Sequence, residues 1–215
     1  MSKIGIVDYG SGNIHSIEKA LKYVGAETNL ITEPKQVDEC DKIILPGVGA
    51  FGSASRRLQS LGFKEKILKV IIERKPVLGI CVGMQMLFER SFEYGEHSGL
   101  AALSGSIEKI KPSVYMGLKV KIPHIGWSAI CRPVKNSNKL WNKTILKGIS
   151  EDTKFYFVHS YSANPKNPDI CLADTIYGSQ HLTAAVQSGN LYGTQFHPEK
   201  SGEAGLVVLE NFSKL

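Results

Sequence analysis

The N-terminal half of the chain alternates short apolar runs with stretches whose apolar residues fall on one helical face. Four runs have the length and apolar content of buried strands: Lys3 to Asp8, Glu27 to Ile31, Lys42 to Leu45 and Val77 to Ile80. The stretches 14–24 and Ser53 to Arg74 have helical periodicity. This alternation predicts a three-layer α/β fold, with a largely parallel central sheet flanked by helices.

The C-terminal half is richer in β-branched and aromatic residues, which favour strands. Strands are expected at Lys119 to Pro123, Gly126 to Ile130, Lys154 to Tyr161, Cys171 to Ile176, Leu182 to Gln187 and Leu191 to Phe196. A last helix is expected at Glu203 to Lys214, and a surface excursion at Lys135 to Trp141. We therefore expect antiparallel strands in this half of the sheet.

Length and composition indicate one domain, residues 1–215, with 42% hydrophobic and 21% charged residues. No apolar run is long enough to span a membrane and the N-terminus has no signal-peptide pattern, so we expect a cytoplasmic protein without a membrane partner. The stretch from Lys109 to Lys154 contains ten basic residues and only two acidic ones. Because no nucleic-acid motif accompanies them, a solvated face or an acidic protein partner is favoured over nucleic acid.

The four cysteines lie about forty residues apart, at Cys40, Cys81, Cys131 and Cys171. They form no C-x-x-C pair and no cluster with histidines at metal-ligand spacing. We therefore expect neither disulfides nor a metal site, and no cofactor.

The run Pro76 to Arg90 places a cysteine at a predicted strand-to-helix turn. Val77 to Ile80 predicts the strand, and Met84 to Arg90 consists of good helix formers. The turn, Gly79-Ile80-Cys81-Val82-Gly83, has the spacing of the G-x-S-x-G nucleophile elbow with sulfur in place of oxygen. At a helix start, free N–H groups favour the reactive thiolate. The alternative is a buried core cysteine beside a tight turn.

The segment Pro46 to Gly52 contains G-x-G-x-x-G between a predicted strand and a predicted helix. That context fits a dinucleotide-binding loop, but no acidic residue for a ribose follows the next strand. A glycine-rich loop beside Cys81 is better suited to present backbone N–H groups to an oxyanion, after a peptide flip if necessary.

A histidine and a glutamate flank Pro198 at the end of the last predicted strand. In an extended segment His197 and Glu199 point to one side, and Pro198 favours extended dihedrals at His197. Together with Cys81 they would complete a Cys–His–Glu arrangement. Alone, His197 could equally be a strand-end residue bonded to a carboxylate.

Four motifs resemble the class I (triad) glutamine amidotransferases over nearly the whole chain: 79–85, 196–199, 46–49 and 157–161. Within that class, the segments 8–14, 46–52, 123–127 and 157–161 are most similar to the glutaminase subunits of imidazole glycerol phosphate synthases. The resemblance implies hydrolysis of L-glutamine to glutamate and ammonia through a thioester on Cys81, with His197 as the proton carrier. Ammonia would pass to a (β/α)8 barrel synthase subunit, bound as a heterodimer, that makes imidazole glycerol phosphate and AICAR in histidine biosynthesis.

The resemblance also implies roles around the triad. The oxyanion would be held by backbone N–H groups of Val82 and, after a flip, of Val48 or Gly49. Gln85 and the backbone of Ser160 and Tyr161 would hold the amino and carboxylate ends of the substrate. The residues implied to face the partner are Asn13, Trp127 and Lys200, for which the alternatives are a helix cap, a core aromatic and a surface lysine.

The chain departs from the family pattern at Ser128, where asparagine is usual, at Gly99 to Leu103 and in the lysine-rich stretch 135–143. None of these touches the triad, but they leave open a paralogous glutaminase that feeds a sugar amidotransferase of surface polysaccharide synthesis. A cysteine peptidase would use the same triad, but Gln85 and the 46–49 loop disfavour it. A catalytically inactive binding module is disfavoured because all three triad residues are present.

Overall fold

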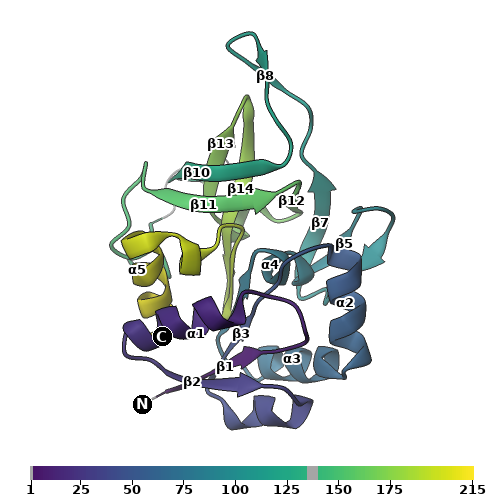
Figure 1. Cartoon of the computed structure of the whole chain (residues 1–215), viewed down its shortest axis with the longest axis vertical. Coiled ribbons are helices and arrows are strands. Elements are labelled where there is room, and N and C mark those ends of the chain that lie inside the picture. Colours follow the sequence, from purple (N-terminus) through teal and green to yellow (C-terminus); the bar gives the residue numbers. More distant parts are fainter. Residues whose placement is uncertain (1, 135–139) are drawn as a thin grey trace.

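The structure, a computed structural model, describes residues 2–134 and 140–215. Its main sheet has nine strands in the order β11-β10-β13-β14-β15-β4-β3-β1-β2. Their bounds are β1 Lys3–Val7, β2 Glu27–Ile31, β3 Lys42–Leu45, β4 Val77–Ile80, β10 His124–Cys131, β11 Lys154–His159, β13 Cys171–Tyr177, β14 Gln180–Ser188 and β15 Leu191–Thr194. Helices cover both faces of its lower half (Figure 1), which confirms the predicted fold class.

The sheet changes from parallel to antiparallel pairing at β15. Strands β2, β1, β3, β4 and β15 pair in parallel, whereas β14, β13, β10 and β11 continue in antiparallel fashion. The carboxyl ends of parallel strands meet at one edge of a sheet. The segments that follow β3, β4 and β15 are therefore gathered at one place, and these segments carry the predicted site.

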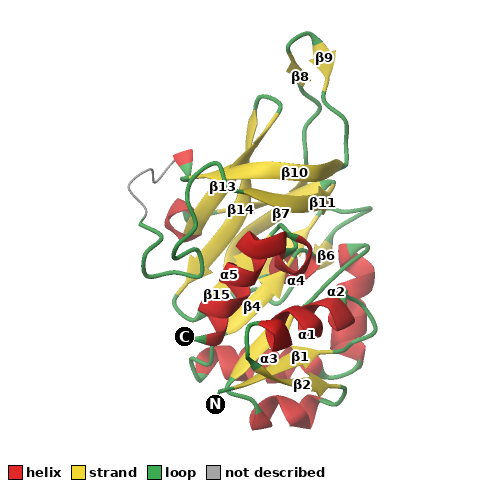
Figure 2. Cartoon of the chain, turned by 60° about the vertical axis from the view of Figure 1, so that its left-hand side comes forward, coloured by secondary structure: helices red, strands yellow, loops and turns green. Residues whose placement is uncertain are grey.

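The helices α1 (Ile14–Tyr23), α2 (Phe51–Ser60), α3 (Phe63–Ile72) and α5 (Gly202–Ser213) each bury an apolar face. In α1 the buried residues are Ile17, Ala20 and Leu21, at helical spacing. Gly25 follows with φ +78°, a conformation that glycine adopts without steric cost and that ends the helix. The helices α1 and α5 lie on one face of the sheet, and α2 and α3 lie on the other (Figures 1 and 2).

The helix expected over Ser53 to Arg74 is two helices. The chain turns between α2 and α3 because Gly62 has φ +75°, and both pieces keep a buried face. The helix expected over Met84 to Arg90 was also wrong. The helix α4 (Val82–Met86) ends before this stretch does, and β5 (Phe88–Ser91) pairs with β7 (Leu103–Lys109), so tertiary pairing overrides helix propensity.

Two further sequence predictions need correction. Of the strand expected at Lys119 to Pro123, only Lys119 is in a strand, in the small hairpin of β8 (Val114–Tyr115) and β9 (Leu118–Lys119), and a cis peptide bond precedes Pro123. In the expected surface excursion, Lys135 to Lys139 lie outside the described residues. Trp141 is not a surface residue: it is 6% exposed and its indole N–H donates to the carbonyl of Leu172, at 2.7 Å.

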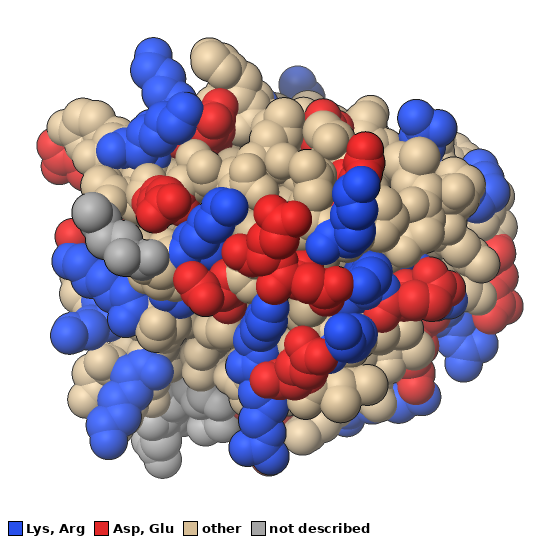
Figure 3. Space-filling model, turned by 90° about the horizontal axis from the view of Figure 1, so that it is seen from below, with Lys and Arg blue, Asp and Glu red and all other residues tan. Residues whose placement is uncertain are grey.

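A second sheet, β12-β7-β5-β6, adds β6 (His97–Ser98) and β12 (Tyr161–Pro165), and the β8–β9 hairpin projects from the end of the molecule (Figure 2). The opposite end carries interspersed acidic and basic side chains (Figure 3). Partly exposed ion pairs also join Asp38 to Lys66 and Lys69, as is usual for solvated surface. No helix within the described ranges is long and apolar enough to cross a membrane.

Candidate active site

Cys81 occupies the sharp turn between β4 and α4 (Val82–Met86), as the sequence predicts. Its backbone has φ +54° and ψ −112°, which is strained for a residue with a side chain. A Cβ on Gly83 would collide with the carbonyl of Leu45, and one on Gly79 would meet the backbone of Met84. The glycines are thus required by close backbone approach on either side of the cysteine.

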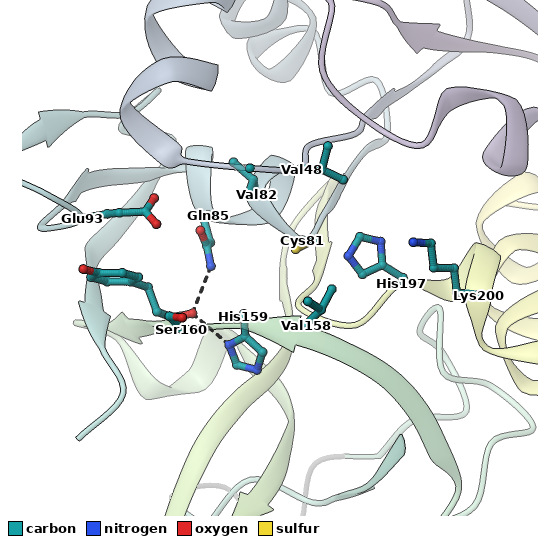
Figure 4. A pocket seen from close by; sticks show the side chains of 12 residues that line it. Val48, Cys81, Val82, Gln85, Glu93, Val158, His159, Ser160, His197 and Lys200 are labelled. Carbon is teal, nitrogen blue, oxygen red and sulfur yellow. Dashed lines mark hydrogen bonds between the residues drawn. The ribbon is translucent and has the colours of Figure 1, made fainter. Parts of the chain in front are cut away.

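His197 and Glu199 form a buried pair next to this turn. His197 Nδ1 lies 2.8 Å from Glu199 Oε1, and the two side chains are 2% and 0% exposed. Because a carboxylate only accepts hydrogen bonds, Nδ1 is the donor and Nε2 is left as the basic nitrogen. Nε2 makes no hydrogen bond with any described residue, and the ring lies beside Cys81 (Figure 4). The three side chains therefore have the order of a Cys–His–Glu arrangement.

The local route to this pair differs from the predicted one. His197 is extended, with φ −96° and ψ 98°, as the following proline favours, but Pro198–Lys200 form a 3-10 turn instead of continuing the strand. The turn brings Glu199 back to the imidazole. The backbone of His197 is fixed at both ends: its N–H donates to the carbonyl of Tyr156 at 3.0 Å, and its carbonyl accepts from the hydroxyl of Ser201.

The histidines near the cavity have pKa values that are shifted in opposite directions. Burial by itself lowers the pKa of His197, but the neighbouring Cys81 sulfur and the Glu199 carboxylate outweigh it and raise the pKa to about 10. Burial lowers the pKa of His159 to about 3, although its bond to the carbonyl of Tyr161 opposes the shift. Burial also lowers the pKa of His124, which bonds His159, to about 4. Only His197 is thus prepared to carry a proton at neutral pH.

The glycine-rich loop after β3 borders the same cavity. Val48 and Gly49 line it, and Val82 stands at the first position of α4, where an N–H has no acceptor within the helix. The N–H of Val48 is directed to the hydroxyl of Ser11 at 3.4 Å, and the same hydroxyl donates to the carbonyl of Val48 at 2.8 Å. In this conformation the N–H of Val48 is directed to Ser11 and not into the cavity.

The cavity encloses about 290 Å³, at the small end of ligand sites, which suits a ligand of amino-acid size. It is lined by Val48, Gly49, Cys81, Val82, Gln85, Glu93, Val158, His159, Ser160, Tyr161, His197 and Lys200. Within the described ranges, no group of three or more histidine, cysteine or acidic side chains could hold a metal ion. The arrangement can attack a carbonyl carbon with sulfur and transfer protons through His197.

A family model described as glutamine amidotransferase class-I matches residues 5–214. The chain belongs to the class I glutamine amidotransferases. The match covers the elbow, the glycine-rich loop and the His197–Glu199 turn together, so the predicted resemblance is confirmed.

Curated relatives within this family match along their full length. The imidazole glycerol phosphate synthase subunit HisH 1 of Legionella pneumophila (strain Paris) is 43% identical over 215 residues, which is 100% of both chains. The corresponding HisH subunit of Methanothermobacter thermautotrophicus is 44% identical over 212 residues, 99% of this chain and 98% of that one.

Solved amidotransferase structures share the fold. A crystal structure of a glutamine amidotransferase aligns with a TM-score of 0.72 over 99% of both chains at 17% identity. The PurLQS structure from Thermotoga maritima aligns with a TM-score of 0.69 at 21% identity, over 99% of this chain and 98% of that one. At these identities the likeness concerns the fold alone.

Of the three predicted partner-facing residues of this amidotransferase, Asn13 and Trp127 do not fit their simpler alternatives. Asn13 makes no side-chain cap on α1 and instead donates to Glu199 Oε1 at 3.4 Å. Trp127 is 54% exposed, so it is not a core aromatic, and it packs edge-on against Tyr156. Lys200 is exposed, as its alternative of a surface lysine implies, and it also lines the cavity (Figure 4).

Two polar residues of the site were missed by sequence reasoning. Glu93 lines the cavity and its Oε2 accepts the N–H of Phe51, but it lies in a stretch without periodicity that gives no signal. Gln195 is fully buried beside Cys81, and its Nε2 lies 3.6 Å from the Cys81 sulfur. Its position two residues before His197 was the available signal.

Proposed function

We propose that this amidotransferase hydrolyses L-glutamine to glutamate and ammonia and delivers the ammonia to a separate synthase subunit of histidine biosynthesis. The observation that carries the proposal is the buried His197–Glu199 pair, whose Nε2 is left open beside Cys81. The full-length relatives named as imidazole glycerol phosphate synthase subunits support the choice of pathway.

In the first half of the reaction, His197 Nε2 already holds the proton given up by the Cys81 thiol, as its raised pKa allows, and the Cys81 sulfur attacks the side-chain carboxamide carbon of glutamine. The carbon–nitrogen bond then breaks, the proton passes from His197 to the leaving nitrogen, and ammonia departs. In the second half, His197 removes a proton from water, the hydroxide attacks the thioester, and glutamate leaves as the sulfur recovers the proton. Glu199 keeps the imidazole in the tautomer that serves both halves.

The tetrahedral intermediates carry a negative oxygen, for which we assign the backbone N–H groups of Val82 and of Val48 or Gly49. The Val48 amide is bonded to Ser11, so it must turn before it can donate into the cavity. Removal of one oxyanion donor costs about 10²–10³ in rate, so an unturned loop would keep the enzyme almost idle.

The amino and carboxylate groups of the glutamine substrate are assigned to further residues that line the cavity. The Nε2 of Gln85 donates to the carbonyl of Tyr161, which leaves Gln85 Oε1 as an acceptor for an ammonium group. Glu93 supplies a carboxylate in the same cavity and suits that ammonium group as well. Backbone N–H groups of Ser160 and Tyr161 would receive the substrate carboxylate.

The partner would be a (β/α)8 barrel synthase that forms a heterodimer over the cavity, which Lys200 lines, and that also contacts Asn13 and Trp127. In this proposal residues 1–215 act as one amidotransferase domain in the cytoplasm. The synthase consumes the ammonia in a lyase and ring-closing step that yields imidazole glycerol phosphate and AICAR.

The test is glutamate release from glutamine by the purified chain, alone and with the barrel synthase of the histidine pathway. We expect slow release alone, strong stimulation by that synthase, and none from the Cys81→Ala variant under either condition. Stimulation only by a sugar amidotransferase would reassign the chain to the paralogous pathway. Peptide cleavage without glutamate release would overturn the glutaminase proposal.

A further inference from the structure

Gln195 is a fully buried amide at the point where β15 leads into the His197 segment. Strands β4 and β15 pair in parallel with Ile80 opposite Thr194, so the residue after each strand is adjacent to the other: Cys81 and Gln195. The N–H of Cys81 donates to the carbonyl of Thr194 at 2.7 Å, which fixes the two backbones. Because a buried amide without partners is costly, its contacts are expected to be specific.

The orientation of the Gln195 amide follows from its neighbours. The carbonyl of Tyr161 can only accept, so the group of Gln85 that faces it, at 3.1 Å, is the NH₂. The same NH₂ lies 3.0 Å from Gln195, and therefore the group of Gln195 that faces Gln85 is its oxygen. The Gln195 NH₂ is thereby turned toward the Cys81 sulfur, at 3.6 Å. A backbone carbonyl thus sets the direction of both amides.

We propose that Gln195 is a further catalytic residue, which donates an N–H to the Cys81 sulfur and stabilises the thiolate, and that Gln85 positions it. The inference rests on the proposed role of Cys81 as nucleophile. A donor stabilises a charged acceptor more than a neutral one, so the bond favours the thiolate over the thiol. The thiol proton goes to His197 Nε2, and no further reagent is needed.

The experiment measures the rate at which iodoacetamide alkylates Cys81, followed by mass spectrometry of the Cys81 peptide between pH 5 and pH 10. Neither glutamine nor the synthase takes part, so the outcome is independent of the reaction and partner proposed above. The Gln195→Met variant keeps the approximate volume and removes the donor. We expect the midpoint of its alkylation curve to move up by about one pH unit, so that alkylation at neutral pH slows about tenfold.

A matched control is Thr194→Val, the neighbouring fully buried residue, whose hydroxyl has no hydrogen-bond partner among the described residues. We expect its alkylation curve to coincide with that of the wild type. Gln195→Glu keeps the shape but turns a carboxylate oxygen toward the sulfur. It should raise the midpoint further than Gln195→Met does.

In steady-state assays, Gln195→Met should lower kcat several-fold with little change in KM, because Gln195 does not line the cavity. An unshifted curve in a folded Gln195→Met or Gln195→Glu protein would overturn the proposal. An equal shift in Thr194→Val would overturn it too, since the effect would then be one of general packing.

Discussion

The side-chain amide of Asn13 donates a hydrogen bond to Glu199 Oε1, 3.4 Å away, and so ties the start of α1 to the carboxylate that holds His197. The same oxygen accepts from His197 Nδ1, so one atom links the predicted partner face to the proton carrier. Disturbance at Asn13 should therefore reach catalysis through the orientation of the imidazole.

Substitution of Glu199 should lower the rate of glutamine hydrolysis more than substitution of Asn13. Glu199→Gln leaves no carboxylate to fix the His197 tautomer, and we expect kcat to fall by about 10²–10⁴. Asn13→Ala removes one long hydrogen bond and should cost only about 2–10-fold. Synthase-stimulated glutamate release measures both, and equal losses would contradict the assigned order.

The elbow conformation should be visible in stability. Cys81→Ala and Cys81→Gly both remove the sulfur, but only glycine adopts φ +54° with ψ −112° without strain. Strain of about 1–3 kcal/mol exceeds the usual entropic cost of glycine, so Cys81→Gly should be the more stable by about 1 kcal/mol. Urea unfolding measures the difference, and a less stable Cys81→Gly would show that the turn is relaxed.

Ser11 should restrain the loop that completes the oxyanion hole. Ser11→Ala removes both contacts with Val48, and we expect glutamine hydrolysis without the synthase to rise about 2–10-fold. The fold-stimulation by the synthase should shrink accordingly. Ser55→Ala, which removes a hydroxyl bonded to the carbonyl of Ser98, serves as the control and should leave both rates unchanged.

Stability should fall in mild acid because of two buried histidines. The folded-state pKa values of His124 and His159 are lowered to about 4 and about 3, so below the unfolded value of 6.5 only the unfolded chain takes up these protons. The unfolding free energy should fall between pH 6.5 and pH 5, by up to ~1.4 kcal/mol per pH unit for each histidine.

Urea unfolding at pH 7 and pH 5 tests this expectation. His124→Gln keeps a polar partner for His159 and removes one titrating group, so its pH slope should be smaller than that of the wild type. A wild-type unfolding free energy that does not change over this range would contradict the lowered values.

The sequence alone determined the sharp turn at Cys81 and the extended backbone of His197, because both depend on residues close by in the chain. The glycines beside Cys81 and the proline after His197 act on the backbone within two residues, so these features were predictable. Apolar periodicity likewise determined the α/β class, since a buried stripe is a property of one segment at a time. It could not place the break at Gly62 or the strand Phe88–Ser91, because β5 exists only by pairing with β7.

Contacts between distant segments were decided by the tertiary structure alone. Three such contacts join Glu93 to Phe51, Ser11 to Val48 and Asn13 to Glu199. The paired residues are 42, 37 and 186 positions apart along the chain, and no local pattern encodes them. The register of β4 against β15 likewise decides that Gln195, rather than a neighbour, faces Cys81. A residue type determines which bonds a side chain can make, whereas the packing of the whole sheet determines which atoms come within reach.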